Sequence, residues 1–224
     1  MEIKCKLSNR ANYGGKRTSP IAYIVVHYTA NYGDTAKNNA DYFAREVVKA
    51  SAHYFVDESE VWQSVPDDRI AWHCGGGLQG AGGHTYYGKC KNANSIGVEI
   101  CMLDKQGRLR QGSIDNAAKL VRELMRKYGV PADRVIRHYD VTGKNCPAPI
   151  VTDPARWRKF KDSLKEDDDM IVYKKPADVP AWGRPTVDKL IRHGSIKPDP
   201  DGSVNLSSDL LRMLVINDRE GLYK

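Results

Sequence analysis

Residues 21–30 read IAYIVVHYTA, a short apolar run rich in β-branched side chains. Such a run predicts a buried strand over Ile21–Val26 that ends at His27. Residues 95–102 read SIGVEICM and alternate strictly between two kinds of side chain, which predicts a second strand. The alternation points the Glu99 carboxylate away from the apolar face of that strand. The apolar face carries Ile96, Val98, Ile100 and Met102, and the other face carries Gly97, Glu99 and Cys101.

Helical periodicity lies between and after these strands. The spacing of apolar residues predicts a helix from about Thr35 to Val48 and a long amphipathic helix that ends at Gly129. Asp153 followed by Pro154 predicts the start of a third helix. Strands and helices interleave through residue 165, so the predicted fold class is α/β, a central mixed β-sheet flanked by helices. Shorter strands are predicted at Tyr54–Val56 and Val61–Val65, as a hairpin, and at Val135–Arg137.

The composition is that of a soluble globular protein, with 41% hydrophobic and 28% charged residues among 224. No run of about 18 apolar residues occurs, so we expect no membrane insertion. The N-terminal residues lack the apolar segment of a signal peptide, so we expect synthesis and retention in the cytosol. The formal charge of +7 favours an anionic partner, either nucleic acid or a wall rich in teichoic acid, or serves solubility alone. Five cysteines in such a chain argue against a disulfide framework.

The pattern changes after residue 165, where four acidic residues run together and helical periodicity stops. We therefore predict a catalytic domain over 1–165, an acidic linker over 166–178 and a small module over 179–224. The module is expected to be mostly helical, with a short hairpin whose two strands flank the DPDG turn at 199–202. A unit of about 45 residues can hardly bury a sufficient core, so we expect self-association through it.

Histidine and cysteine side chains occur near the ends of two predicted strands. His27 ends the first strand, while His138 and Cys146 share the segment HYDVTGKNCP after Val135–Arg137. Zinc prefers imidazole and thiolate ligands, and a catalytic zinc keeps its fourth position open for water. These three side chains are one candidate ligand set, although six histidines allow several other combinations.

Three stretches of the chain resemble a known family. In this order, VVHYTA, NANSIGVEI and RHYDVTGKNCP are similar to the zinc N-acetylmuramoyl-L-alanine amidases, whose fold is shared with phage-type amidase lysozymes and peptidoglycan recognition proteins. The resemblance covers roughly residues 20–165 and implies Zn²⁺ held by His27, His138 and Cys146. Non-catalytic members that only bind peptidoglycan typically lack that thiolate, so Cys146 favours an enzyme over a binding module.

The resemblance also implies catalytic roles for two residues outside the ligand set. Glu99 matches the catalytic glutamate of one branch of the family and would act as general base. Lys144, two residues before Cys146, would donate to the oxyanion of the tetrahedral intermediate. Another branch has a catalytic tyrosine where this chain has Ala52. That departure places more of the chemistry on Glu99.

Two further residues are predicted to contact the substrate. His73 matches a histidine that similar proteins place near the cleft, and Trp72 beside it would pack against sugar or stem peptide. A core role for the Trp72 indole is the alternative. His53 is expected to support the sheet rather than to bind metal.

The C-terminal pattern resembles, less specifically, the small cell-wall-targeting modules of endolysins from phages of Gram-positive hosts. We therefore predict a phage endolysin that hydrolyses the amide bond between the N-acetylmuramoyl lactyl group and L-alanine of peptidoglycan. Its expected partners are peptidoglycan and wall polymers, and it would stay in the host cytoplasm until released to the wall. The alternatives are a bacterial autolysin or wall-recycling amidase, and a non-catalytic peptidoglycan-binding protein. A nucleic-acid partner is not expected, because the sequence contains no recognition motif.

Met170 follows directly on the acidic run, whose codons can spell a purine-rich stretch resembling a bacterial ribosome-binding site. The hypothesis is an internal start that yields residues 170–224 as a separate fragment. Such fragments would pair with the module of full-length chains and add wall-binding sites by avidity. The alternative is a solvated linker followed by an incidental methionine.

Overall fold

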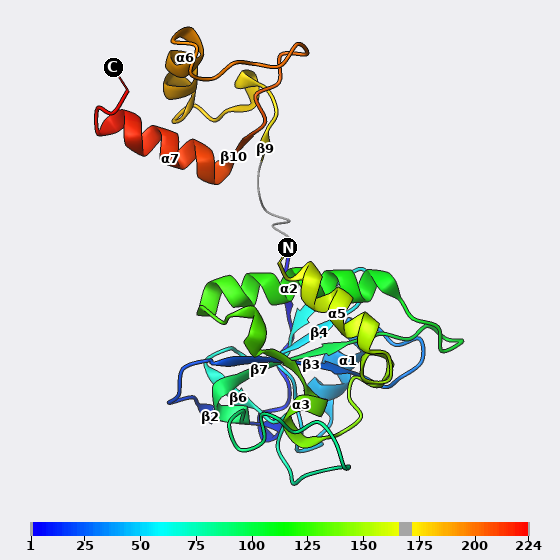
Figure 1. The fold of residues 1–224 in the computed structure, drawn as a ribbon. Helices are drawn as coiled ribbons and strands as arrows, with labels where there is room; N and C mark the ends of the chain where they lie inside the picture. The colour runs from blue at the N-terminus through cyan, green and yellow to red at the C-terminus, as the bar shows by residue number, and fades with distance from the viewer. Residues whose placement is uncertain (1, 166–171, 224) are drawn as a thin grey trace. The chain divides into compact units, whose positions relative to one another are not determined.

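The computed structural model describes residues 2–165 and 172–223, which fall into two compact units that divide near residue 166 (Figure 1). Met170, with the proposed internal start, lies outside the described residues. Among the helices that are described, none combines the length and the apolar character needed to cross a membrane.

The first unit is built on a six-stranded mixed sheet, as the sequence predicts. Neighbouring strands run parallel except for the antiparallel pair β4–β5, which is the predicted hairpin. The strand predicted to end at His27 runs one residue further, to Tyr28, so His27 lies inside it. In spatial order the strands are β1 (Lys4–Cys5), β5 (Val61–Gln63), β4 (Tyr54–Val56), β7 (Ser95–Ile100), β3 (Tyr23–Tyr28) and β8 (Val135–Arg137).

One face of this sheet forms the main hydrophobic core. It packs against helix α2 (Gln111–Tyr128), which ends at the predicted Gly129 in a left-handed conformation, and against α4 (Ala148–Val151) and α5 (Pro154–Ser163). Asp153 caps α5 as predicted, since its carboxylate accepts hydrogen bonds from two backbone N–H groups of the first turn. The buried strand residues in this core are Ile24, Val26, Tyr54, Val56, Val61, Ile96, Val98, Ile100 and Val135.

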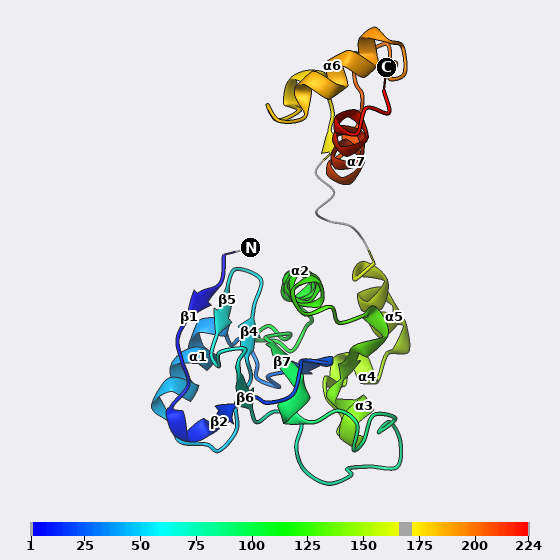
Figure 2. The same cartoon turned by 90° about the vertical axis from the view of Figure 1, so that its left-hand side faces the viewer.

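Helices α1 (Ala36–Arg45) and α3 (His138–Thr142) pack on the opposite face (Figures 1 and 2). Phe43 of α1 packs against the buried Phe55 of β4, and Val141 of α3 packs in one cluster with Val25 of β3. This face of the central strands also carries His27 and Glu99, which are paired in register on the adjacent strands β3 and β7. A polar pair therefore lies on a sheet face that is covered by two separate apolar clusters.

The predicted first helix is too long at its C-terminal end. It begins as expected, directly after its cap Thr35, but it stops at Arg45, and Val47 is 55% exposed rather than part of an apolar stripe. The reason is Asn12, whose buried side chain donates to the carbonyl of Glu46 and accepts from the backbone N–H groups of residues 48 and 49. A side chain distant in sequence thus satisfies the backbone groups that another helical turn would have paired.

Several short elements were not predicted. Strands β2 (Tyr13–Lys16) and β6 (Arg69–Ala71) form a small antiparallel sheet of their own. Both are too short to show periodicity, and their pairing depends on a contact between distant segments. Short 3₁₀ turns complete the first unit at η1 (Arg10–Asn12), η2 (Asn92–Asn94) and η3 (Ala132–Arg134).

The second unit is mostly helical, and its hairpin was predicted wrongly. The Asp199–Gly202 turn forms, with the Gly202 N–H donating to the Asp199 carbonyl at 2.7 Å, but it does not join two strands. Instead β10 (Leu206–Ser207) pairs with β9 (Val172–Tyr173), whose residues fall in the predicted linker range 166–178. The remaining elements are η4 (Pro176–Asp178), α6 (Arg184–Arg192) and α7 (Ser208–Arg219), the last capped by Ser207.

Candidate metal and catalytic site

A cleft of about 690 Å³ opens on the polar face of the first unit's sheet. Its lining includes every residue that the sequence singled out for function, together with side chains of α1 such as Asn38, Tyr42 and Phe43. The seven predicted residues that meet here are His27, Trp72, His73, Glu99, His138, Lys144 and Cys146. The structure therefore brings together residues that span most of the first unit's sequence.

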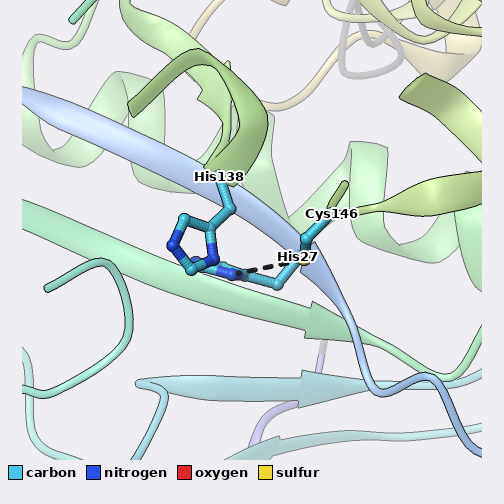
Figure 3. Close-up of side chains that lie close together, drawn as sticks. All are labelled: His27, His138 and Cys146. Atoms are coloured by element: carbon cyan, nitrogen blue, oxygen red, sulfur yellow. Dashed lines mark hydrogen bonds between the residues drawn. The ribbon is translucent and has the colours of Figure 1, made fainter. Parts of the chain in front are cut away.

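The candidate metal ligands are brought together by strand pairing. β8 lies beside β3 with Val26 opposite Arg137, so His138, the first residue of α3, emerges next to His27. The chain then returns, and the Tyr139 N–H donates to the Cys146 carbonyl at 2.9 Å. Ligand atoms of the three residues all lie within 4.8 Å of one another, and Figure 3 shows the three side chains converging.

The return of the chain to Cys146 depends on a glycine. Gly143 ends α3 with φ of +79°, a left-handed conformation that most side chains avoid. A Cβ atom at this position would also lie 2.2 Å from the carbonyl oxygen of Gln79, which belongs to the glycine-rich stretch 75–88. Only glycine fits both conditions, so Gly143 fixes the approach of Cys146 to the two histidines.

The chemistry of the three ligands fits a zinc ion. Burial lowers the pKa of His27 well below its usual value and lowers that of His138 to about 4, so both rings are neutral at pH 7. The Nδ1 atom of His27 lies 3.7 Å from the Cys146 sulfur. Among the described residues, neither ring nitrogen of His138 has a hydrogen-bond partner, and its Nε2 is buried. Two neutral imidazoles and a cysteine are a donor set typical of zinc.

Glu99 lies beside the ligands on the polar face. One carboxylate oxygen is 3.9 Å from His27 Nδ1, and the other is buried without a hydrogen-bond partner in the described part of the chain. Burial raises the pKa of Glu99 to about 8, although the nearby Lys144 lowers it. A carboxylate with a pKa near neutrality can both accept and return a proton.

Lys144 is exposed at the mouth of the cleft and forms no ion pair with the residues described. Burial is the main cause of the lowered pKa of His138, and the positive charge of Lys144 lowers it further. The same charge also lowers the pKa of Glu99. The ammonium charge therefore acts on a candidate ligand and on the candidate base. Ala52, where a family branch has tyrosine, is buried and also lines the cleft, without a functional group of its own.

His53 supports the sheet, as predicted. It is completely buried, and its Nδ1 accepts a hydrogen bond of 3.0 Å from the backbone N–H of Gly97. On the other side of the ring, Nε2 lies 3.2 Å from the Arg69 carbonyl. Within the described residues, the metal-ligand cluster does not include His53.

Trp72 and His73 occupy different positions in the cleft wall. The backbone of Trp72 forms two hydrogen bonds with Ser51, and its indole N–H has no partner among the residues described. The His73 ring, in contrast, forms hydrogen bonds with His27 at 3.0 Å and with Ser95 at 3.1 Å. The sequence reasoning missed Ser95, although the alternation that places Glu99 on the polar face also places Ser95 there.

Comparison with known proteins identifies relatives of the first unit. The family model described as N-acetylmuramoyl-L-alanine amidase matches residues 17–149. A probable N-acetylmuramoyl-L-alanine amidase of Bacillus licheniformis is 38% identical over 163 residues, which is 70% of this chain and 45% of that protein. The amidase CwlA of Bacillus subtilis is 35% identical over 170 residues, 75% of this chain and 58% of its own length. The chain thus spans about half the length of the curated relatives it matches.

Solved structures share the fold. The structure of PlyL superposes with a TM-score of 0.61 at 32% identity and covers 75% of this chain and 99% of PlyL. The catalytic domain of XlyA gives a TM-score of 0.60 at 28% identity, with 73% of this chain and 99% of that domain covered. Both likenesses extend over the sheet and helices that carry the cleft.

Proposed function

This chain belongs to the N-acetylmuramoyl-L-alanine amidase family, and we propose that it hydrolyses the amide bond between the N-acetylmuramoyl lactyl group and L-alanine of peptidoglycan. The observation that carries the proposal is the convergence of His27, His138 and Cys146 beside Glu99 in one open cleft. The cysteine favours catalysis over binding alone, because a thiolate in this ligand set has no use in recognition of a wall peptide.

Zinc is the cofactor that these residues would hold. When bound, it would activate water and polarise the scissile carbonyl. Glu99 is suited to take a proton from the attacking water and to return it to the leaving amine of L-alanine, because its pKa of about 8 is close to neutrality. Lys144, at the mouth of the same cleft, would donate to the oxyanion that develops on the carbonyl.

Trp72 is the residue best suited to hold the glycan. Its side chain lines the main cleft and also a neighbouring pocket of about 480 Å³, which Tyr87 and Lys91 line as well. An indole whose N–H has no partner among the described residues offers an apolar face for a sugar ring and one hydrogen-bond donor. We infer that the substrate passes over Trp72.

For the whole protein we propose a phage endolysin that acts on Gram-positive walls, with the second unit as the wall-binding part. Helix α7 of that unit exposes Leu210, Met213 and Ile216 at 43%, 59% and 59%, and these apolar residues support either wall binding or self-association. The internal start at Met170 remains part of this proposal, as does residence in the host cytoplasm until release. Hydrolysis of the wall of the bacterium that encodes the protein, during normal growth, would instead indicate an autolysin.

Digestion of purified Gram-positive peptidoglycan tests the proposed reaction. We expect new amino termini of L-alanine in the products, identified by dinitrophenylation and mass spectrometry, and no new reducing sugar ends. New reducing ends would indicate a glycosidase. Sedimentation of the chain with walls that remain intact would indicate a non-catalytic binding protein.

A further inference from the structure

A chain of polar contacts runs from the metal site to the backbone on the far side of His73. The His27 Nε2 lies 3.0 Å from His73 Nδ1, and His73 Nε2 lies 3.1 Å from the Ser95 hydroxyl. That hydroxyl donates to the Lys91 carbonyl at 2.7 Å. At the other end, His27 Nδ1 faces the Cys146 sulfur at 3.7 Å.

The position of each proton in this chain follows from its last member. A carbonyl oxygen only accepts, so the single hydroxyl proton of Ser95 is used on Lys91. The Ser95 oxygen must then accept from His73 Nε2–H, which leaves His73 Nδ1 without a proton. His73 Nδ1 therefore accepts from His27 Nε2–H. A neutral imidazole has one N–H, so the Nδ1 of His27 is left as a bare lone pair.

We propose that Ser95 and His73 are positioning residues that hold His27 as its Nε2–H tautomer, with Nδ1 presented to the metal. The inference rests on the proposed zinc site but adds two residues to it. It also assigns His73 a role other than substrate contact, since both of its ring nitrogens are already used within the protein. A histidine ligand whose second nitrogen is held in this way loses less freedom on binding and keeps one orientation.

The surrounding structure is shaped to keep His73 in place. Its ring lies directly over Gly97 of β7, where an added Cβ atom would be 2.6 Å from His73 Cγ. On the backbone, the N–H of His73 donates to the Asn92 side chain at 3.1 Å. Ser95 and His27 are buried at 0% and 1% exposure, so the half-buried His73 is held at both ring nitrogens by side chains that water does not reach. Gly97 thus provides the space, and Asn92 fixes the backbone.

Two variants of the full chain separate positioning from packing. His73→Phe keeps a ring over Gly97 but removes both nitrogens. Ser95→Ala removes only the hydroxyl that accepts from His73 in this chain of hydrogen bonds. Competition with a chromogenic chelator should show zinc affinity about 10–100-fold weaker in each variant. Cys101→Ala is the control, because its buried sulfur accepts from the Asn39 side chain at 3.5 Å rather than contacting a member of this chain of hydrogen bonds. Its zinc affinity should stay within about twofold of the wild type.

The tautomer itself is read by ¹⁵N nuclear magnetic resonance of the zinc-loaded wild type. We expect a proton on His27 Nε2 and none on Nδ1, and this reading is independent of whether any variant folds. A proton on Nδ1, or wild-type zinc affinity in a folded His73→Phe protein, would overturn the proposal. A wild-type chain that binds no zinc at all would instead contradict the proposed function, so the two failures are distinguishable.

Discussion

The two faces of the central sheet differ completely, although the same strands build both. On the face under α2, alternate residues of β7 are apolar and fully buried in the main core. On the opposite face, the intervening residues are Ser95, Gly97 and Glu99: a hydroxyl, a space for His73 and a carboxylate. A shift of one residue in register would exchange the two sets, so the apolar face also fixes the register of the catalytic one.

The difference indicates that stability and chemistry are divided between alternate positions of the same strands. The apolar face provides burial, while the polar face holds groups whose burial is costly unless a metal or a hydrogen bond compensates. Variants on the two faces should therefore have separable effects. Activity should change on one face and stability on the other.

The largest effect is expected from loss of a metal ligand. Cys146→Ser should reduce hydrolysis of peptidoglycan by about 10³-fold or more, because the chain would no longer hold the ion that activates water. His27→Ala and His138→Ala should behave alike. Turbidity loss of a wall suspension measures this, with Cys5→Ser, an exposed free thiol, as the matched control. A Cys146→Ser protein as active as this control would break the assignment.

Removal of the Glu99 carboxylate should reduce turnover by about 10²–10⁴-fold, the range expected for a general base. Zinc content should stay at the wild-type level, because Glu99→Gln leaves all three ligands in place. Metal analysis and initial rates on the same sample check both statements. Glu58→Gln, at an exposed carboxylate, is the control. A Glu99→Gln rate within a few-fold of that control would mean that another group moves the proton.

A core variant should show the reverse pattern. Ile100 is fully buried on the apolar face, so Ile100→Ala should lower the free energy of unfolding by about 2–5 kcal/mol. The rate per folded molecule should be unchanged at low temperature. Urea unfolding followed by circular dichroism measures the free energy of unfolding. Ile3→Ala, at a 37% exposed isoleucine, provides the reference. Equal stability of the two variants would contradict the division between faces.

Per pH unit, the smallest effect concerns acid stability. Burial lowers the pKa of His53 to about 3, whereas the unfolded chain has a histidine pKa near 6.5. Between these values the unfolded state binds the extra proton, so stability falls as the pH drops from about 6.5 towards 3, by up to about 1.4 kcal/mol per pH unit.

His53→Gln can still accept from the Gly97 N–H. It should reduce the dependence of the free energy of unfolding on pH by the contribution of one proton. Denaturant midpoints at several pH values below 6.5 would show a shallower dependence than in the wild type. The same slope in both proteins would mean that His53 is protonated while folded.

The sequence was sufficient for the fold class and for the residues that meet in the cleft. Strict alternation in β7 placed Glu99 correctly, and the Asp153 cap and the end of α2 at Gly129 were read from local signals. Each of these predictions depends on neighbours in the chain, which the sequence displays directly.

What the sequence could not show depends on contacts between distant segments. Asn12 ends α1 early, and β9 rather than a neighbouring segment pairs with β10. The hydrogen bonds that join His73 to Ser95 and His27 were missed because nothing in the sequence connects these three side chains, and the predicted contact of His73 with substrate stays a prediction. Hydrogen bonds of this kind form only when the fold brings distant residues together, so no local sequence pattern indicates them.

Titration of the metal-free protein with Zn²⁺ tests the central claim most directly. After chelation and dialysis, the chain should release no L-alanine amino termini from peptidoglycan, and release should rise to a plateau at about one equivalent of zinc. Undiminished release by the metal-free chain, or a plateau that never depends on zinc, would contradict the account.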